Sequence, residues 1–504
     1  MRESKFYKVF AIVLSILLLI VSGFMVFQIF KLNMLPNKLL IPISIIVLLI
    51  DAIFIVILNF FGRNLFTKIF ISILVVIVGC GFTFGGFYMM KTSTMFDKIT
   101  DTSGKVKNTV SVLTMKGSSL EDVKDLKGKK VGVLKSIDSY GTKKSLADIK
   151  KNKVSIQQET FDSIKDLAVG LHDGKVDAII LNQTYIPNVT EDFELDWNFE
   201  TATKVIHETV YYTEKTNTAK NVDDITSHAF SILISGNDTY GTLNTVSRSD
   251  VNMIVTVNPT TGTILMTSIP RDYYVTTQCD PQLGCQIGAL DKLTHTGVHG
   301  VDTTKATLEN LLGIDINYTF RVNFSSLVEI VDALGGVEVT VEPGYAVPEL
   351  LHGEGRGVTE GVNHLDGELA LGYARERYAY QEGDRQRVKN QQQVLKGIID
   401  KATSPAIITN YASLMDALSG AFETNMSPKE IQKLVQSQLS DPKSWKMESY
   451  SLDGTGSTEF CAELGNAAYV MIPNQETVDL AKRKIQAVVN GQSADSITAE
   501  TSAE

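Results

Sequence analysis

The chain has 504 residues, which is long enough for two or three domains. Its formal net charge is −10 and its isoelectric point is about 5.4, and this acidic balance argues against a general nucleic-acid binder. Any site for an anionic ligand must therefore be local.

Three long apolar stretches come first, at residues 9–30, 39–60 and 69–90. Each is about long enough to cross a ~30 Å hydrocarbon core, so residues 1–90 are predicted to form a three-helix transmembrane region. The first stretch lacks a small-residue cleavage site, and we expect it to stay attached rather than to be removed as a signal peptide. Basic residues before it favour a cytoplasmic N-terminus, which places everything after Met90 outside the cell.

Asp51 lies in the middle of the second apolar stretch, where a carboxylate is costly. It marks either a functional contact, such as a lipid-headgroup site, or a hydrogen bond to a neighbouring helix. The second arrangement is the commoner of the two, and we expect it here.

Residues 91–107 are polar, and we interpret them as a connector. A small α/β accessory domain is predicted over residues 108–216, because strand-like segments at 126–134 and 176–181 flank a helical pattern at 163–171. Lysine is dense in this domain. The lysines serve either a polyanionic cell-wall polymer or, as mixed charge more often does, a solvated face.

A larger α/β domain is predicted over residues 225–490. Its strand signals and helical patterns alternate, which predicts a layered sheet with helices packed on it. The strands are expected at residues 230–235, 252–257, 263–269 and 337–341, the helices at 323–334 and 366–373, and further short strands between 445 and 472. Residues 491–504 are small and acidic, and we expect them to form a disordered tail.

Three of the four cysteines lie beyond the apolar stretches. Cys279 and Cys285 bracket a loop that contains proline and glycine, and outside the cell a bridge between them is one candidate. The spacing leaves open the alternative pairing of Cys285 with Cys461.

The arginines are unevenly distributed. There are eleven in the chain, none of them between residues 64 and 247, and most fall in the larger domain at Arg248, Arg271, Arg321, Arg356, Arg375, Arg377, Arg385 and Arg387. A planar guanidinium donates two parallel hydrogen bonds and suits phosphate oxygens better than an ammonium does. Aspartates at 238, 250, 272 and 384 accompany these arginines and indicate a divalent cation held with the anion.

Spacing suggests how part of this set converges. Arg375 and Arg377 leave the same face if their segment is extended, and Asp384, Arg387 and Gln391 share one face if theirs is helical. Taken singly, the first pair is also explained by a solvated strand and the second by an ordinary helix ion pair. The sequence contains no zinc-type His and Cys spacing, no P-loop and no nucleophile elbow.

Residues from about 231 to 398 resemble the LytR-CpsA-Psr family. Six ordered motifs carry the resemblance: ILISGNDTYG, SRSDVNMIVTVNPTTGTILMTSIPRDYYV, DKLTHTG, VNFSSLVEIVDALGGVEVTV, GVNHLDGELALGYARERY and GDRQRVKNQQQVL. With three spans and the accessory domain in front, the chain resembles the streptococcal capsule-locus members. Asn390 is a departure, because relatives often carry a further arginine there.

The resemblance implies an enzyme on the outer face of a Gram-positive cell membrane that moves capsular polysaccharide or a related glycopolymer from a polyprenyl-pyrophosphate carrier onto peptidoglycan. Asp238 and Asp250 would hold Mg²⁺. The pyrophosphate oxygens would be bound by Arg248, Arg271, Arg375, Arg377 and Arg387, with support from Asp384 and Gln391. Within this set, Arg271, Arg375, Arg377 and Asp384 would act at the reacting phosphate, and the isoprenoid would lie between the sheet and the helix at 324–334.

Two other functions remain open. One is a membrane-bound regulator (attenuator) of capsule transcription, but the short tail and loop predicted on the cytoplasmic side are too small to fold a DNA-binding module, so DNA is not an expected partner. The other is a polyprenyl-pyrophosphate hydrolase, in which water replaces the acceptor. The lipid membrane and capsule-assembly proteins complete the expected partners.

Overall fold

The structure, a computed structural model, describes residues 5–61, 64–100, 105–193, 195–215, 218–237, 239, 243, 246–279, 285–404, 417 and 420–498. The described residues fall into two compact units. The first draws on residues 1–100, 403–419 and 427–444, and the second on residues 101–402, 420–426 and 445–504. The domain boundaries expected from the sequence remain predictions.

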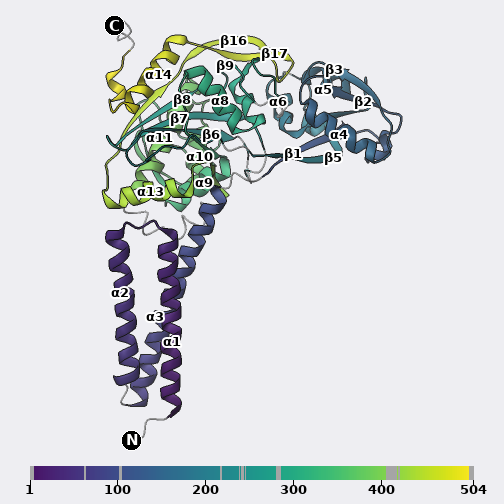
Figure 1. The fold of residues 1–504 in the computed structure, drawn as a ribbon. Coiled ribbons are helices and arrows are strands. Elements are labelled where there is room, and N and C mark those ends of the chain that lie inside the picture. Colours follow the sequence, from purple (N-terminus) through teal and green to yellow (C-terminus); the bar gives the residue numbers. More distant parts are fainter. Residues whose placement is uncertain are drawn as a thin grey trace. The chain divides into compact units, whose positions relative to one another are not determined.

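The first unit contains the three long apolar helices (Figure 1). They are α1 Lys5–Leu32, α2 Asn37–Val56 with a π-helical turn η1 Ile57–Phe61, and α3 Leu65–Ile99. By length and hydropathy all three are candidate membrane spans, as the sequence predicts. Helix α13 Pro428–Ser440 belongs to the same unit, where Gln436 donates to the Asn33 carbonyl at 2.5 Å.

Asp51 makes the helix contact that the sequence favours. Its side chain is buried, and the Ser22 hydroxyl of α1 donates to Oδ2 at 2.5 Å. Because hydrocarbon offers no other partner, this bond ties α2 to α1.

Most of the connector predicted over residues 91–107 lies in regular secondary structure. Helix α3 continues to Ile99, and strand β1 begins at Lys105. Thr92, Met95, Phe96 and Ile99 are buried and recur every three or four residues, which is the pattern of an amphipathic helix. Polar residues on the other face of this helix make the composition of the segment polar, and they concealed the apolar pattern in the sequence.

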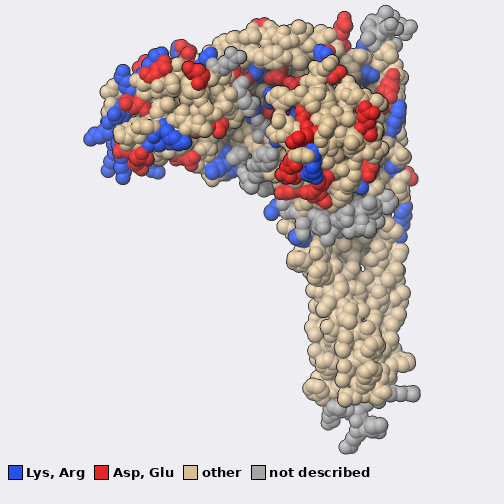
Figure 2. Space-filling model, turned by 180° about the vertical axis from the view of Figure 1, so that it is seen from behind, with Lys and Arg blue, Asp and Glu red and all other residues tan. Residues whose placement is uncertain are grey.

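The accessory lobe, which we define as residues 105–214, is a five-stranded α/β unit. Its strand order is β3-β2-β4-β1-β5, with β2 parallel to β3 and β4 and with β1 antiparallel to β4 and β5. The strands are β1 Lys105–Met115, β2 Lys130–Leu134, β3 Gln157–Phe161, β4 Ala178–Asn182 and β5 Thr203–Glu214, and the helices are α4 Ser139–Lys151, α5 Ile164–His172, α6 Ile186–Glu191 and α7 Phe199–Ala202. Blue and red side chains are intermixed on the face of the lobe shown in Figure 2, as on a solvated surface.

The main lobe, which is the rest of the second unit, is built on a six-stranded mixed sheet of order β14-β11-β6-β7-β8-β15. The strands are β6 Phe230–Asn237, β7 Ser249–Asn258, β8 Thr263–Ile269, β11 Tyr318–Val322, β14 Glu423–Thr424 and β15 Lys446–Ser451. Smaller pairs are β9 Tyr274–Thr276 with β10 Leu290–Lys292, β12 Val337–Val341 with β13 Gly361–Leu365, and β16 Gly454–Cys461 with β17 Asn466–Pro473. The predicted layered α/β fold is confirmed.

Helices cover both faces of this sheet. On one face, α8 Val301–Leu312 and α14 Gln475–Val489 pack their apolar sides against sheet residues such as Leu233, Ile254 and Leu265. The other face meets α11 Asp384–Thr403, where the Gln392 amide donates to the Ser268 hydroxyl at 2.9 Å. Helices α9 Phe324–Ala333 and α10 Gly367–Arg375 form a separate core with β12 and β13.

Local signals account for α9. Asn323 caps its first turn through Ser326, and the helix stops at Gly335 and Gly336, whose φ angles are 76° and 85°. A Cβ on Gly336 would also lie 2.4 Å from Nε2 of His364. The predicted helix stop is confirmed.

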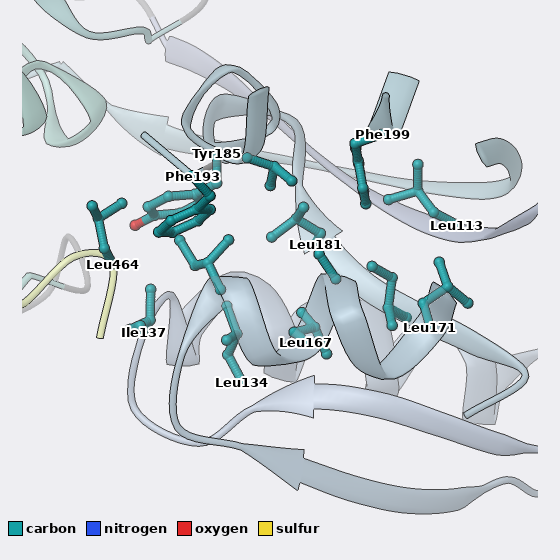
Figure 3. Close-up of a cluster of buried hydrophobic side chains, with 14 of the residues drawn as sticks. Leu113, Leu134, Ile137, Leu167, Leu171, Leu181, Tyr185, Phe193, Phe199 and Leu464 are labelled. Atoms are coloured by element: carbon teal, nitrogen blue, oxygen red, sulfur yellow. The ribbon is translucent and has the colours of Figure 1, made fainter. Parts of the chain in front are cut away.

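The accessory lobe packs directly on the main lobe. Leu464, from the turn between β16 and β17, enters the accessory cluster beside Tyr185 and Phe193 (Figure 3). Its carbonyl accepts a hydrogen bond from the Ile164 amide at 3.0 Å. One buried cluster therefore contains residues of both lobes.

The tail expected to be disordered from residue 491 is ordered as far as it is described. Ala494 is buried, and its amide donates to Oε2 of Glu448 at 2.6 Å. Glu448 is itself buried, so its carboxylate needs hydrogen-bond donors such as the Ala494 amide. This requirement explains why the residues around Ala494 are ordered. Residues 499–504 lie outside the described residues. Cys279 and Cys285 form a disulfide, and Cys461 is a buried thiol.

Candidate functional site

Asp250 and Arg271 meet because their strands are antiparallel neighbours. Asn252 of β7 pairs with Ile269 of β8, so the residues two positions further out lie opposite each other. Nη1 of Arg271 is 2.9 Å from Oδ2 of Asp250, and both side chains are largely buried. The sheet register thus builds the first ion pair of the site.

A third segment closes on this pair. The 3₁₀ helix η5 Leu293–His299 carries Thr294, whose hydroxyl donates to Oδ1 of Asp250 at 2.7 Å and whose amide donates to the Arg271 carbonyl at 2.9 Å. Gly297 allows the approach, since a Cβ there would lie 2.5 Å from the Ser249 amide nitrogen. Both carboxylate oxygens of Asp250 are therefore held in place.

Helix α11 supplies the other charged cluster. It begins at Asp384, so the segment is helical, which is the condition under which Asp384, Arg387 and Gln391 share a face. Oδ1 of Asp384 lies 3.1 Å from Nη2 of Arg387 and 3.6 Å from Nη1 of Arg377. Nη2 of Arg377 also donates to the Tyr378 hydroxyl at 2.6 Å.

Electrostatic coupling shows that the two clusters adjoin. Burial alone would raise the pKa of Asp250, but the charges of Arg271, Arg248 and Arg387 and the Thr294 hydroxyl hold it below its usual range. Burial lowers the pKa of Arg387, and the Arg271 and Arg377 charges add to this while Asp384 opposes it. The structure thus gathers Arg248, Asp250, Arg271, Arg377, Asp384 and Arg387.

This crowding favours an anionic ligand. Buried guanidinium groups repel one another, and an anion among them relieves that repulsion. The Nε–H groups of Arg271 and Arg387 are buried without a hydrogen-bond partner among the described residues, so donors remain for a ligand.

Arg375 differs from the expectation. The segment is not extended there, because α10 runs through Arg375, and the guanidinium lies 4.2 Å from the centroid of the Phe324 ring. Side chains of α11 satisfy carbonyls at the end of this helix: Asn390 donates to the Tyr373 carbonyl at 3.0 Å and Gln391 to the Ala374 carbonyl at 3.3 Å. Arg375 and Arg377 therefore take different partners, and Gln391 contacts backbone.

The other arginines of the rich stretch have partners elsewhere. Arg321 bonds to the Leu243 carbonyl at 2.8 Å and pairs with Glu423, Arg356 pairs with Asp366, and Arg385 pairs with Asp453 at 2.7 Å. The uneven distribution of the arginines therefore indicates that a site exists, but it does not identify which arginines belong to it.

The described part of the site contains only one of the two expected magnesium ligands. Asp250 is an ionised hard-oxygen donor, which suits Mg²⁺. Asp238, the second expected ligand, lies outside the described residues. Among the residues that are described, no group of three or more His, Cys, Asp or Glu side chains is placed to hold a metal.

Sequence reasoning missed two contributors, Lys292 and Thr294, and it named Asp272 only as one of the aspartates that accompany the arginines. Oδ2 of Asp272 is 3.6 Å from Nε of Arg271, and Oδ1 is 3.9 Å from Nζ of Lys292. Lys292 and Thr294 both belong to the motif DKLTHTG, so the signal was present, but nothing local assigns either residue a partner.

The comparison with protein families shows which family the chain belongs to. The LytR_cpsA_psr family model matches residues 195–486, which is more than half of the chain. The chain belongs to the LytR-CpsA-Psr family. A second model, described as DNA polymerase processivity factor, matches residues 66–181, which start within α3 and end within β4 and so follow no structural unit.

Named members of the LytR-CpsA-Psr family are similar over half of the chain. A polyisoprenyl-teichoic acid–peptidoglycan teichoic acid transferase, TagU of Enterococcus faecalis, is 32% identical over 52% of this chain and 81% of its own length. TagT of Bacillus subtilis, of the same description, is 32% identical over 51% of this chain and 76% of its own. A solved structure described as TagT bound to LIIa-WTA aligns with a TM-score of 0.42 and 30% identity over 54% of this chain and 94% of that one.

Proposed function

We propose that this chain is a membrane-anchored transferase that moves a glycopolymer from a polyprenyl-pyrophosphate carrier onto peptidoglycan. The observation that carries the proposal is the buried arginine and aspartate cluster around Asp250 and Arg271. The family and the names of the relatives favour the same class of carrier. Capsular polysaccharide and wall teichoic acid are the two candidate polymers.

The arginines neutralise the pyrophosphate in this proposal. Arg248, Arg271, Arg377 and Arg387 bind its oxygens, and Arg375 joins them from the end of α10. Asp384 fixes Arg377 and Arg387, with which it pairs. Transfer at phosphorus depends mainly on positioning and charge neutralisation, and buried guanidinium groups supply both.

Magnesium is the proposed cofactor. Asp250 and Asp238 would hold it, and the ion would add positive charge at the pyrophosphate. Arg271 and Thr294 already fix the Asp250 carboxylate, so the ligand oxygens are oriented in advance.

The isoprenoid is proposed to lie on an apolar face of the main sheet. The face of the main sheet opposite Leu233 carries rows of apolar side chains, such as Ile232 beside Val255 and Phe320 beside Ile234. Ile232, Ile234 and Phe320 are only partly buried. Burying such a face against a lipid chain contributes about 25 cal/mol per Å². We propose that the chain lies there, next to α9.

The second unit is proposed to lie outside the cell. The Cys279–Cys285 disulfide suits an oxidising compartment, and three spans with a cytoplasmic N-terminus lead outward. A reporter fused at Glu504 that is active only in the cytoplasm would reverse this topology and favour a regulator of capsule synthesis instead.

In the proposed reaction an acceptor hydroxyl of peptidoglycan forms the new bond. Attack at phosphorus breaks the bridging P–O bond and releases polyprenyl monophosphate, whereas attack at the sugar carbon breaks the C–O bond and releases polyprenyl pyrophosphate. Water as the acceptor would make the protein a hydrolase.

The test uses the full-length chain in lipid nanodiscs with a carrier-linked glycopolymer and peptidoglycan fragments. Mass spectrometry of lipid that co-purifies identifies the carrier, and analysis of the products identifies the released lipid and the wall-linked polymer. A wall-linked product that depends on Arg271 supports the transferase. Release of the polymer from its lipid carrier without such a product favours the hydrolase.

A further inference from the structure

One segment of the main lobe, β10 with η5, contacts the accessory lobe. Nζ of Lys292 lies 2.5 Å from Oδ1 of Asp192, and Nε2 of His295 lies 3.0 Å from the Asn188 amide and 3.7 Å from Oδ2 of Asp192. The Lys292 and Asp192 side chains are almost fully buried. Such a pair persists only with close geometry and further bonds, and the Asn188 amide provides one to Asp192 at 2.9 Å.

The same segment also contacts the arginine site. Lys292 approaches Asp272, which lies beside Arg271, and Thr294 bonds to both Asp250 and the Arg271 backbone. An unbroken series of charged contacts thus runs from Asp192 through Lys292 and Asp272 to Arg271 and Asp250.

Asp192 comes from outside the family domain. It follows α6 in the accessory lobe, three residues before the family model begins at residue 195. The lobe therefore adds a carboxylate to a site that the family domain otherwise builds from its own residues.

We propose that Asp192 and Lys292 are positioning residues, through which docking of the accessory lobe fixes Arg271 for binding the carrier pyrophosphate. The accessory lobe thus acts on substrate binding without touching the substrate. The ligand in this inference rests on the proposed function. The link from Asp192 through Lys292 to Arg271 does not depend on that function.

The first test needs no ligand. In hydrogen exchange of the full-length chain in detergent, Asp192→Asn should speed exchange at the Thr294 amide, which donates to Arg271, while the β7 amides keep their wild-type rates. Lys135→Met, which removes an exposed accessory-lobe pair with Asp162, is the matched control and should change neither. Wild-type exchange at Thr294 in a folded Asp192→Asn variant would overturn the proposal.

The second test measures binding of geranylgeranyl pyrophosphate by calorimetry. Lys292→Met should weaken it about five-fold, and Lys292→Arg, which keeps the charge, should restore most of the loss. In an Arg271→Lys background, Lys292→Met should weaken binding by less than about two-fold, because its effect passes through Arg271. The full loss in that background would mean that Lys292 acts by another route and would overturn the proposal.

The two proposals fail differently. If the wild-type chain does not bind the prenyl pyrophosphate, the proposed function fails, and the hydrogen-exchange result alone decides the link between Asp192 and Arg271.

Discussion

The Thr294 hydroxyl donates to Oδ1 of Asp250, opposite the oxygen that Arg271 holds. A carboxylate held from both sides cannot turn away when a ligand arrives. Three segments that are far apart in the sequence, at β7, after β8 and in η5, thereby fix one carboxylate.

Arg377→Ala should abolish polymer attachment with little effect on folding. The side chain is about one-third exposed and its partners Asp384 and Tyr378 are partly exposed, so few buried groups lose a partner. Arg385→Ala, which removes an exposed pair between α11 and Asp453, is the matched control and should retain attachment. Wall-linked polymer and the melting temperature are measured for both. Full attachment by Arg377→Ala would remove it from the site.

Asp250→Asn should weaken the magnesium dependence of transfer and lower its rate by roughly ten-fold or more. An amide is a poorer magnesium ligand than a carboxylate, and it leaves Arg271 without its counter-charge. The measurement is a magnesium titration of transfer. Asp315→Asn, an exposed carboxylate that pairs with Lys220, is the control. An unchanged magnesium midpoint in Asp250→Asn would count against a ligand role.

His295 should make the stability of the second unit depend on pH. Burial alone lowers its pKa, but the carboxylates of Asp291 and Asp192 raise it to about 9. A raised pKa means that the stabilisation is complete below the unfolded value of roughly 6.5 and is lost as the pH rises through about 9, at about 1.4 kcal/mol per pKa unit. The difference in melting temperature between wild type and His295→Gln should therefore be largest near pH 6 and shrink toward pH 9.5. A constant difference would contradict this.

Ser22 and Asp51 should be coupled within the membrane. A double-mutant cycle of Ser22→Ala and Asp51→Asn should give a coupling of about 0.6 kcal/mol, the usual size for such bonds. Unfolding in bicelles measures it, and Ser44→Ala, whose hydroxyl bonds only within α2 in the described structure, serves as the control partner. Equal coupling of Asp51 to Ser44 and to Ser22 would rule out a specific bond.

Truncation should separate the ordered from the dispensable part of the C-terminus. Ending the chain at Gln492 removes the Ser493 and Ala494 donors from buried Glu448 and should cost about 1–3 kcal/mol. Ending it at Thr498 keeps both donors and should leave the denaturant midpoint unchanged. Equal midpoints for the two truncations would show that Glu448 needs neither donor.

The sequence alone determined the three apolar helices, the α/β class and the family, together with most of the charged residues that gather. Helix length and hydropathy are local properties, and motifs such as SRSD and IPRD place Asp250 and Arg271 at strand ends. The spacing of Asp384 and Arg387 also shows that they share a face if their segment is helical, and the structure makes it helical.

Only the tertiary structure decided the rest. Arg375 ends a helix because Asn390 and Gln391 of α11 satisfy the carbonyls of its last turn, which no local pattern reveals. Asp192 and Lys292 pair across 100 positions, and Ala494 is ordered by the needs of Glu448. In each case the structure is set by a buried polar group that needs a hydrogen-bond or charge partner. That partner is distant in the sequence, so no local pattern reveals it.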